Sequence, residues 1–222
     1  ADEPFADTSM IPMWFLSAFA RQNVTVCLSG DGGDESFAGY VTYAADRIHH
    51  LTRAIPDWAV GAARWVLDRG VPPTRGKVGW DYKARQFLKG HALPFERAHF
   101  SWRTLFDQAE KADLLLPDRR DAVMGSDPFQ GFERHFETVR DCHYLDQAMY
   151  VDIKTWLVDD ILVKVDRMSM AHGLEVRAPF LDHRIVEFAA SLPPDWKLTG
   201  LETKRILKDT AARRLPAEVV QR

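Results

Sequence analysis

One stretch constrains the fold more than any other: a short apolar run followed by a glycine-rich, acidic loop. Residues 24–28, VTVCL, form a β-branched apolar run, which predicts a strand at about residues 23–28, buried on both faces. The loop Ser29–Glu35, SGDGGDE, follows directly, and aromatic residues then recur at helical spacing from Phe37 to Tyr43. Strand, glycine loop and helix form half of an α/β unit, and such folds bind ligands at the carboxyl end of the strand.

The rest of the chain has helical patterns. Helices are expected from Thr8 or Ser9 to Arg21, from Pro56 to about Asp68, from Pro94 to Trp102, around Leu145, Met149, Ile153 and Leu157, and from Lys204 to near Leu215. Residues 107–142 give the weakest pattern. We therefore expect a helix-dominated α/β chain with one clear strand.

Composition excludes several classes of protein. With 46% hydrophobic residues, 27% charged residues and a net charge of −3 in 222 residues, the chain is neither disordered nor collagenous, and it has no basic surface suited to nucleic acid or an anionic membrane. No run reaches the roughly 18 apolar residues of a membrane span. Two cysteines, Cys27 and Cys142, suit a reducing compartment, so a cytoplasmic protein is expected. No repeat or long linker divides the chain, which we treat as one unit.

The loop Ser29–Glu35 has the composition of a phosphate site. Its glycines let the backbone approach a ligand, and amide groups before a helix can bind phosphate oxygens. Three carboxylates, at Asp31, Asp34 and Glu35, would repel a bare phosphate, and a bound Mg²⁺ would resolve that conflict. The alternative is a tight turn in which Asp34 merely caps the next helix.

A second region carries charged residues that alternate with apolar ones. They are Lys164, Asp166, Arg167, Glu175, Arg177 and Asp182. Such spacing is too close for a plain solvated face, so some of these side chains should be partly buried and paired. A structural ion-pair network and a catalytic role both remain open. Near the end, Lys204, Arg205 and Lys208 could be solvated or bind pyrophosphate.

Three ordered motifs resemble those of the synthetase domain of glutamine-hydrolysing asparagine synthetases. They are Leu28–Glu35 with Gly39-Tyr40, then Lys164–Arg167, then Glu175–Asp182, EVRAPFLD. The resemblance spans nearly the whole chain and is weakest from about 50 to 140. It implies a PP-loop ATP-pyrophosphatase domain of Rossmann-like fold, in which a carboxylate is adenylated, pyrophosphate leaves and an amine attacks the acyl-adenylate.

The resemblance also implies roles for individual residues. Ser29, Gly30, Asp31 and Gly32 would bind ATP, with Ser29 and Gly30 contacting its AMP moiety. Asp34 would hold Mg²⁺. Asp31 would stand near the acyl-adenylate and the incoming nucleophile, and Lys204 would hold pyrophosphate, so both are candidate catalytic residues. Glu35, Lys164, Asp166, Arg167, Glu175, Arg177 and Asp182 fit better as structural support.

Two departures from the family pattern matter. The upstream pyrophosphate loop, S-G-G-x-D-S, and the cysteine nucleophile of the glutaminase domain do not occur in the sequence. The downstream motif R-x-K-x-G-F would begin at Arg222. We therefore expect residues 1–222 to be a partial synthetase domain, part of a longer chain with an N-terminal glutaminase domain, and inactive alone.

The expected reaction is ATP-dependent amidation of aspartate to asparagine, with glutamine-derived ammonia as the amine and AMP and pyrophosphate as products. ATP and Mg²⁺ would be the cofactors, with no nucleic-acid or membrane partner, and a homodimer is compatible with the resemblance. Amidation of another carboxylate, such as a sugar acid of a polysaccharide pathway, is one alternative. A non-catalytic binding or assembly module is the other.

Overall fold

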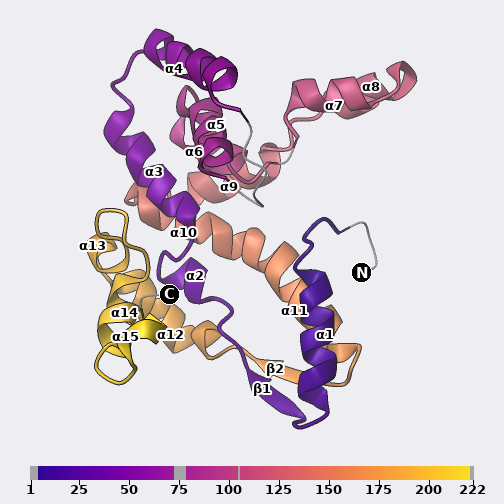
Figure 1. Cartoon of the computed structure of the whole chain (residues 1–222), viewed down its shortest axis with the longest axis vertical. Helices are drawn as coiled ribbons and strands as arrows, with labels where there is room; N and C mark the ends of the chain where they lie inside the picture. Colours follow the sequence, from indigo (N-terminus) through magenta and orange to yellow (C-terminus); the bar gives the residue numbers. More distant parts are fainter. Residues whose placement is uncertain (1–4, 73–78, 105, 221–222) are drawn as a thin grey trace. The chain divides into compact units, whose positions relative to one another are not determined.

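The chain comprises two compact units. A computed structural model describes residues 5–72, 79–104 and 106–220. Unit 1 is formed by residues 1–40 and 145–222, and unit 2 by residues 41–144 (Figure 1). Arg222, the expected start of the downstream motif, lies outside the described residues.

Unit 1 contains the sheet. Strand β1 (Val26–Leu28) pairs in parallel with β2 (Glu175–Arg177), and Cys27 lies opposite Val176. The helices are α1 (Met10–Arg21), α2 (Gly33–Ser36), α10 (Tyr144–Lys154), a π-helical segment (Leu157–Leu162), α11 (Val163–Met170), a 3-10 turn (Pro179–Leu181), α12 (His183–Ser191), α13 (Pro194–Lys197), α14 (Arg205–Ala211) and α15 (Ala217–Val220).

The prediction of a single clear strand was incomplete, because β2 was not foreseen. Its sequence, Glu175-Val176-Arg177, has charged residues on both sides of one valine. Main-chain hydrogen bonds nevertheless join it to the β1 segment: the Glu175 amide donates to the carbonyl of Thr25, and the Ser29 amide donates to the carbonyl of Arg177. The side chains of Glu175 and Arg177 are both exposed and form an ion pair with each other on one side of the strand. The pairing of β2 with β1 therefore buries no charged group.

The prediction that β1 is buried on both faces was wrong. The side chain of Leu28 is 74% exposed and that of Val26 is 38% exposed. Helix α1 packs against α11, and among the described residues no second layer covers these two side chains. A β-branched apolar run therefore marked the strand correctly but not its burial.

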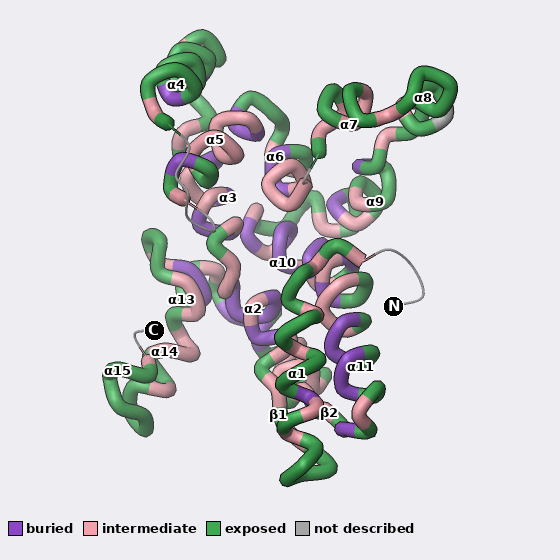
Figure 2. Tube along the Cα trace, turned by 45° about the vertical axis from the view of Figure 1, so that its right-hand side comes forward, coloured by how far each residue is buried: buried purple, intermediate pink, exposed green. Residues whose placement is uncertain are grey.

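The core of unit 1 lies beside the end of the acidic loop. Phe37, directly after α2, is buried with Ala189 and Leu192 of the α12 region, and Phe180 packs on this cluster. Of the four residues predicted as one core-facing helix stripe, Leu145 and Met149 of α10 are buried and Ile153 is half-buried; Leu157, also buried, begins the π-helical segment that follows α10. Figure 2 shows α10 as a largely buried helix. The first set of contacts packs the end of the loop against α12 and the turn Pro179–Leu181.

Unit 2 is wholly helical in its described part. Its helices are α3 (Val41–Thr52), α4 (Asp57–Gly70), α5 (Trp80–His91), α6 (Phe95–Ser101), α7 (Gln108–Leu114), α8 (Pro117–Met124) and α9 (Gln130–Thr138). Three of the predicted helices match α1, α4 and α6 to within a few residues. No described helix of either unit is long and apolar enough to cross a membrane.

Candidate functional site

The acidic loop begins at the carboxyl end of β1, as predicted. The backbone amide of Ser29 donates to the carbonyl of Arg177 at 2.9 Å, which continues the strand pairing by one residue. The chain then turns, with the amide of Gly33 bonded to the carbonyl of Gly30 at 3.2 Å, and enters α2. The loop is thus tied to β2 on one side and to a helix on the other.

Two glycines of the loop pack directly on the third motif. Gly32 has φ +84°, and a Cβ at this position would lie 2.1 Å from Cδ2 of Leu181. A Cβ on Gly33 would lie 3.3 Å from the ring of Phe180. Both the backbone conformation and the close approach therefore require glycine at residue 32. The structure brings the SGDGGDE and EVRAPFLD motifs into contact.

Asp34 and Lys204, which are far apart in the sequence, lie together. The Lys204 ammonium is 2.9 Å from Oδ1 of Asp34, and each side chain is about one-third exposed. Gly39 lies beneath them: a Cβ there would be 1.9 Å from Asp34 Oδ1 and 2.2 Å from Lys204 Cε. Asp34 stands in the first turn of α2, where Gly32 is the capping residue, so the alternative in which Asp34 caps that helix is wrong.

The backbone around this pair is strained. Lys204 and Ala38 both have φ +54°, in the left-handed region that residues with a Cβ seldom adopt. Such conformations persist only where the surrounding structure holds them, and they are concentrated at functional sites. Lys204 directly precedes α14 and is itself a member of the Asp34–Lys204 pair. Ala38 directly precedes Gly39, which contacts both side chains of that pair.

The first residues of the loop carry polar groups without protein partners. The buried hydroxyl of Ser29 has no hydrogen-bond partner among the described residues. Asp31 is half-buried and forms no ion pair within the described chain. Around Gly30, a Cβ would meet no atom within 4 Å. A buried hydroxyl without a partner beside open space is what a ligand-binding loop requires, because such a group is costly unless something bonds to it.

Glu35 points into unit 1 rather than toward the Asp34–Lys204 pair. It is 1% exposed and accepts a hydrogen bond from the Tyr40 hydroxyl at 2.5 Å. Burial raises the pKa of the Glu35 carboxyl, and the nearby carboxylates of Asp34 and Asp152 raise it further, against the Tyr40 hydrogen bond. Glu35 is thus a buried residue that joins the loop to Tyr40.

The charged residues of the second region do not form one cluster. Lys164 is buried and bonds to Asp7. Burial alone would raise the Asp7 pKa, but hydrogen bonds from Lys164 and Ser9 outweigh it and lower that pKa. Asp182 instead caps α12 and pairs with Arg184 at 2.7 Å, which lowers the pKa of Asp182.

The remaining members of that region face solvent. Glu175 and Arg177 form an exposed pair at 2.7 Å, and Asp166 and Arg167 lie exposed on α11. Lys164 and Asp182 each have a structural contact, to Asp7 and at the start of α12 respectively, and the role of the whole set as structural support stays a prediction.

The sequence analysis missed a buried lysine. Lys197 of α13 is fully buried, and its ammonium lies 2.8 Å from Oδ1 of Asp146 on α10. Nothing in the local pattern distinguishes this lysine from its solvated neighbours, because its partner lies 51 positions away. The pair ties α13, and through it α14, to the core of unit 1.

A family model named Asparagine synthase matches residues 1–222. The chain belongs to the asparagine synthase family. Its helix-dominated α/β structure, with two parallel strands, is consistent with that membership.

Several curated proteins resemble this family member. Asparagine synthetase [glutamine-hydrolyzing] 1 of Bacillus subtilis is 30% identical over 226 residues, which cover 100% of the chain and 33% of that protein. A protein of Methanocaldococcus jannaschii, whose name also contains asparagine synthetase [glutamine-hydrolyzing], is 60% identical over 183 residues, 76% of the chain and 30% of that protein. The amidase chyE of Penicillium rubens is 25% identical over 211 residues, 86% of the chain and 29% of that protein. The chain thus spans about a third of its relatives' length, and no solved structure matches it.

Proposed function

We propose that the chain is part of an enzyme that amidates a carboxylate at the expense of ATP, through an acyl-adenylate. The carboxylate is aspartate, the ammonia comes from glutamine, and the products are asparagine, AMP and pyrophosphate. Membership of the asparagine synthase family and the names of the relatives support this reaction.

The observation that carries the proposal is the meeting of Asp34 and Lys204 at the acidic loop. A carboxylate 2.9 Å from an ammonium supplies one ligand for a divalent cation and one positive charge for a phosphate. Among the described residues, no three histidine, cysteine or acidic side chains cluster as a metal site. Mg²⁺ bound by Asp34 would therefore complete its shell with phosphate oxygens and water, as it usually does.

The start of the loop fits the AMP moiety. The Ser29 hydroxyl, buried without a described partner, would donate to a phosphate oxygen, and the open space at Gly30 would admit the phosphate close to the backbone. Mg²⁺, when bound, would neutralise charge on the departing pyrophosphate. Lys204 would hold that pyrophosphate, and Asp31 would accept a proton from the attacking ammonia.

The remaining parts of the proposed enzyme lie outside residues 1–222. We propose that the two-stranded sheet belongs to a PP-loop ATP-pyrophosphatase domain of Rossmann-like fold, which a glutaminase domain in the same polypeptide supplies with ammonia. The 222-residue chain alone is then expected to be inactive, and formation of AMP and pyrophosphate by the purified chain would contradict this.

The proposal is tested by identifying the nucleotide products of the full-length protein incubated with ATP, Mg²⁺, glutamine and aspartate. Formation of AMP and pyrophosphate in equal amounts is expected. ADP and phosphate would mean activation through an acyl phosphate, and would overturn the proposal. Asp31→Asn should reduce overall amidation more than nucleotide binding; a loss of ATP affinity alone would remove Asp31 from its role.

A further inference from the structure

The turn that follows α2 forms the floor under the Asp34–Lys204 pair. Gly39 belongs to this turn, and the three atoms closest to a Cβ built on it all belong to Asp34 and Lys204, at 1.9, 2.2 and 2.8 Å. The two side chains therefore lie directly against the Gly39 backbone. Gly39 has no positive φ, so glycine is required here by the side chains above it. Whatever fixes Gly39 also fixes where these two side chains can lie.

Two adjacent hydrogen bonds close this turn onto α2. The backbone amide of Gly39 donates to the carbonyl of Asp34 at 2.8 Å. The hydroxyl of Tyr40 donates to the carboxylate of Glu35 at 2.5 Å. Each bond joins residues five positions apart, so residues 39 and 40 are held together against residues 34 and 35. The first bond is available to almost any residue, whereas the second depends on the tyrosine and the glutamate.

The turn needs these bonds because it contains a strained residue. Ala38 is fully buried and has φ +54°, a conformation that a residue with a Cβ keeps only where its surroundings hold it. On one side of Ala38, Phe37 is anchored in the core of unit 1. On the other side, the anchors are the amide of Gly39 and the hydroxyl of Tyr40. Loss of the Tyr40 anchor would let Ala38 relax and move Gly39.

Glu35 gives Tyr40 a fixed point on α2. The Glu35 side chain is 1% exposed and follows Asp34 directly in that helix. Leaving a buried carboxylate oxygen without its hydrogen bond costs free energy, so the bond from Tyr40 stays formed in the folded chain. Asp34 and Glu35 thus have different partners: Asp34 pairs with Lys204, and Glu35 holds the turn beneath that pair.

We propose that Tyr40 is a positioning residue of the Asp34–Lys204 pair. Through its hydrogen bond to Glu35 it holds Gly39 beneath the two side chains, and so keeps the carboxylate and the ammonium in place for a magnesium-bound phosphate. Tyr40 acts through Gly39 and does not itself react. The inference rests on the proposed function, in which Asp34 and Lys204 bind Mg²⁺ and pyrophosphate.

Isothermal titration calorimetry of the full-length protein with Mg-pyrophosphate tests this role. Tyr40→Phe removes one oxygen and keeps the ring. We expect its Kd for Mg-pyrophosphate to rise about tenfold, and pyrophosphate release at saturating ATP to fall by a similar factor. Glutaminase activity should be unchanged. The melting temperature of the same samples shows that the variant is folded at the assay temperature. A lower melting temperature with the parent's Kd would mean that Tyr40 supports only the fold, and would overturn the proposal.

Two further variants separate the hydrogen bond from the fold. Glu35→Gln keeps an oxygen acceptor for the Tyr40 hydroxyl, so its Kd should stay within about threefold of the parent's. Gly39→Ala places a methyl group against Asp34 and Lys204 at a residue without positive φ, so it should weaken Mg-pyrophosphate at least about tenfold. A Glu35→Gln protein that binds as weakly as Tyr40→Phe, or a Gly39→Ala protein that binds like the parent, would overturn the proposal.

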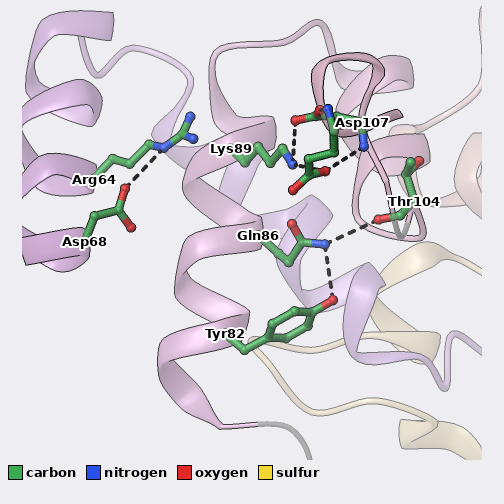
Figure 3. Close-up of polar contacts among 8 residues, drawn as sticks. Arg64, Asp68, Tyr82, Gln86, Lys89, Thr104 and Asp107 are labelled. Atoms are coloured by element: carbon green, nitrogen blue, oxygen red, sulfur yellow. Dashed lines mark hydrogen bonds and ion pairs between the residues drawn. The ribbon is translucent and has the colours of Figure 1, made fainter. Parts of the chain in front are cut away.

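The matched control is Tyr82→Phe in unit 2, which removes the same hydroxyl elsewhere. Figure 3 shows Gln86 beside this hydroxyl, to which its side-chain amide donates at 3.3 Å. Tyr82→Phe should bind Mg-pyrophosphate like the parent, and an equal loss in both tyrosine variants would overturn the proposal. Failure of the parent itself to bind would overturn the proposed function and this inference with it. A parent that binds, with a Tyr40→Phe protein of equal Kd, would overturn this inference alone.

Discussion

The ammonium of Lys204 lies 2.9 Å from the carboxylate of Asp34, over a glycine at residue 39 that has no room for a Cβ. The lysine holds this position in a left-handed backbone conformation, whose cost is of order 1–3 kcal/mol. In the proposed function, Asp34 would bind a cation and Lys204 a phosphate, which would account for this cost.

Asp34→Asn tests the carboxylate. In the full-length protein we expect pyrophosphate release to fall at least about a hundredfold, because the amide cannot replace the charge that Mg²⁺ requires. Glutaminase activity should be unchanged. Glu187→Gln, at an exposed residue of α12, is the control and should retain full pyrophosphate release. Unchanged release in Asp34→Asn would remove this residue from the site.

Gly30→Ala separates ligand binding from folding. A methyl group at residue 30 meets no protein atom within 4 Å and Gly30 has no positive φ, so the melting temperature should stay close to that of the parent. ATP consumption should fall, since the methyl group enters the space assigned to the AMP phosphate. Gly61→Ala, at an equally open position in α4, should leave activity intact and raise stability by about 0.5–1 kcal/mol. Full activity of Gly30→Ala would show that no ligand approaches the loop there.

Asp146→Asn tests the buried lysine that the sequence did not reveal. The change leaves Lys197, fully buried in unit 1, without its counter-charge, which typically costs about 3–5 kcal/mol. Urea unfolding followed by circular dichroism measures the loss. Replacing both residues, as Asp146→Leu with Lys197→Met, should recover much of it. A single variant as stable as the parent would mean that the pair is not coupled in solution.

Acidification should destabilise unit 2 through His91. Burial lowers the pKa of His91 below its ordinary 6.5, and His49 lowers it further, while Thr52 and Asp57 act in the opposite direction. The unfolded chain therefore binds the proton more readily, so the stability contributed by neutral His91 is present above pH 6.5 and is lost as the pH falls below it.

Melting temperatures between pH 8 and pH 5.5 check this effect. The decrease on acidification should be smaller in His91→Asn than in the parent protein. His183→Asn, at a side chain that is 80% exposed, should show the parent's decrease. An identical pH dependence in His91→Asn and the parent would contradict the assignment.

The sequence predicted the loop, its place after a strand and several of the helices, among them α1, α4 and α6, because these depend on neighbouring residues. It did not predict β2, because the charges of Glu175 and Arg177 concealed a strand whose pairing with β1 is a contact between distant segments. The burial of β1 was wrong for a related reason. Apolar composition indicates that a residue can be buried, but burial also needs a neighbouring element, and Leu28 is 74% exposed.

The roles of the individual site residues are proposals, whereas their contacts are observed. Asp34 and Lys204 were both assigned to the pyrophosphate end from the resemblance, and the structure brings them together. The contact of Gly39 with Lys204, the partner of Lys164 and the burial of Lys197 all depend on side chains from distant segments. No local pattern carries that information.

The most direct test of the central proposal is pyrophosphate release by the full-length protein with Mg-ATP and glutamine, measured with and without aspartate. We expect pyrophosphate release to depend on aspartate, with asparagine and AMP formed in equal amounts. Glutamine hydrolysis, measured in the same samples, shows that the protein is active. Pyrophosphate release that does not respond to aspartate, in protein that hydrolyses glutamine, would contradict aspartate as the substrate.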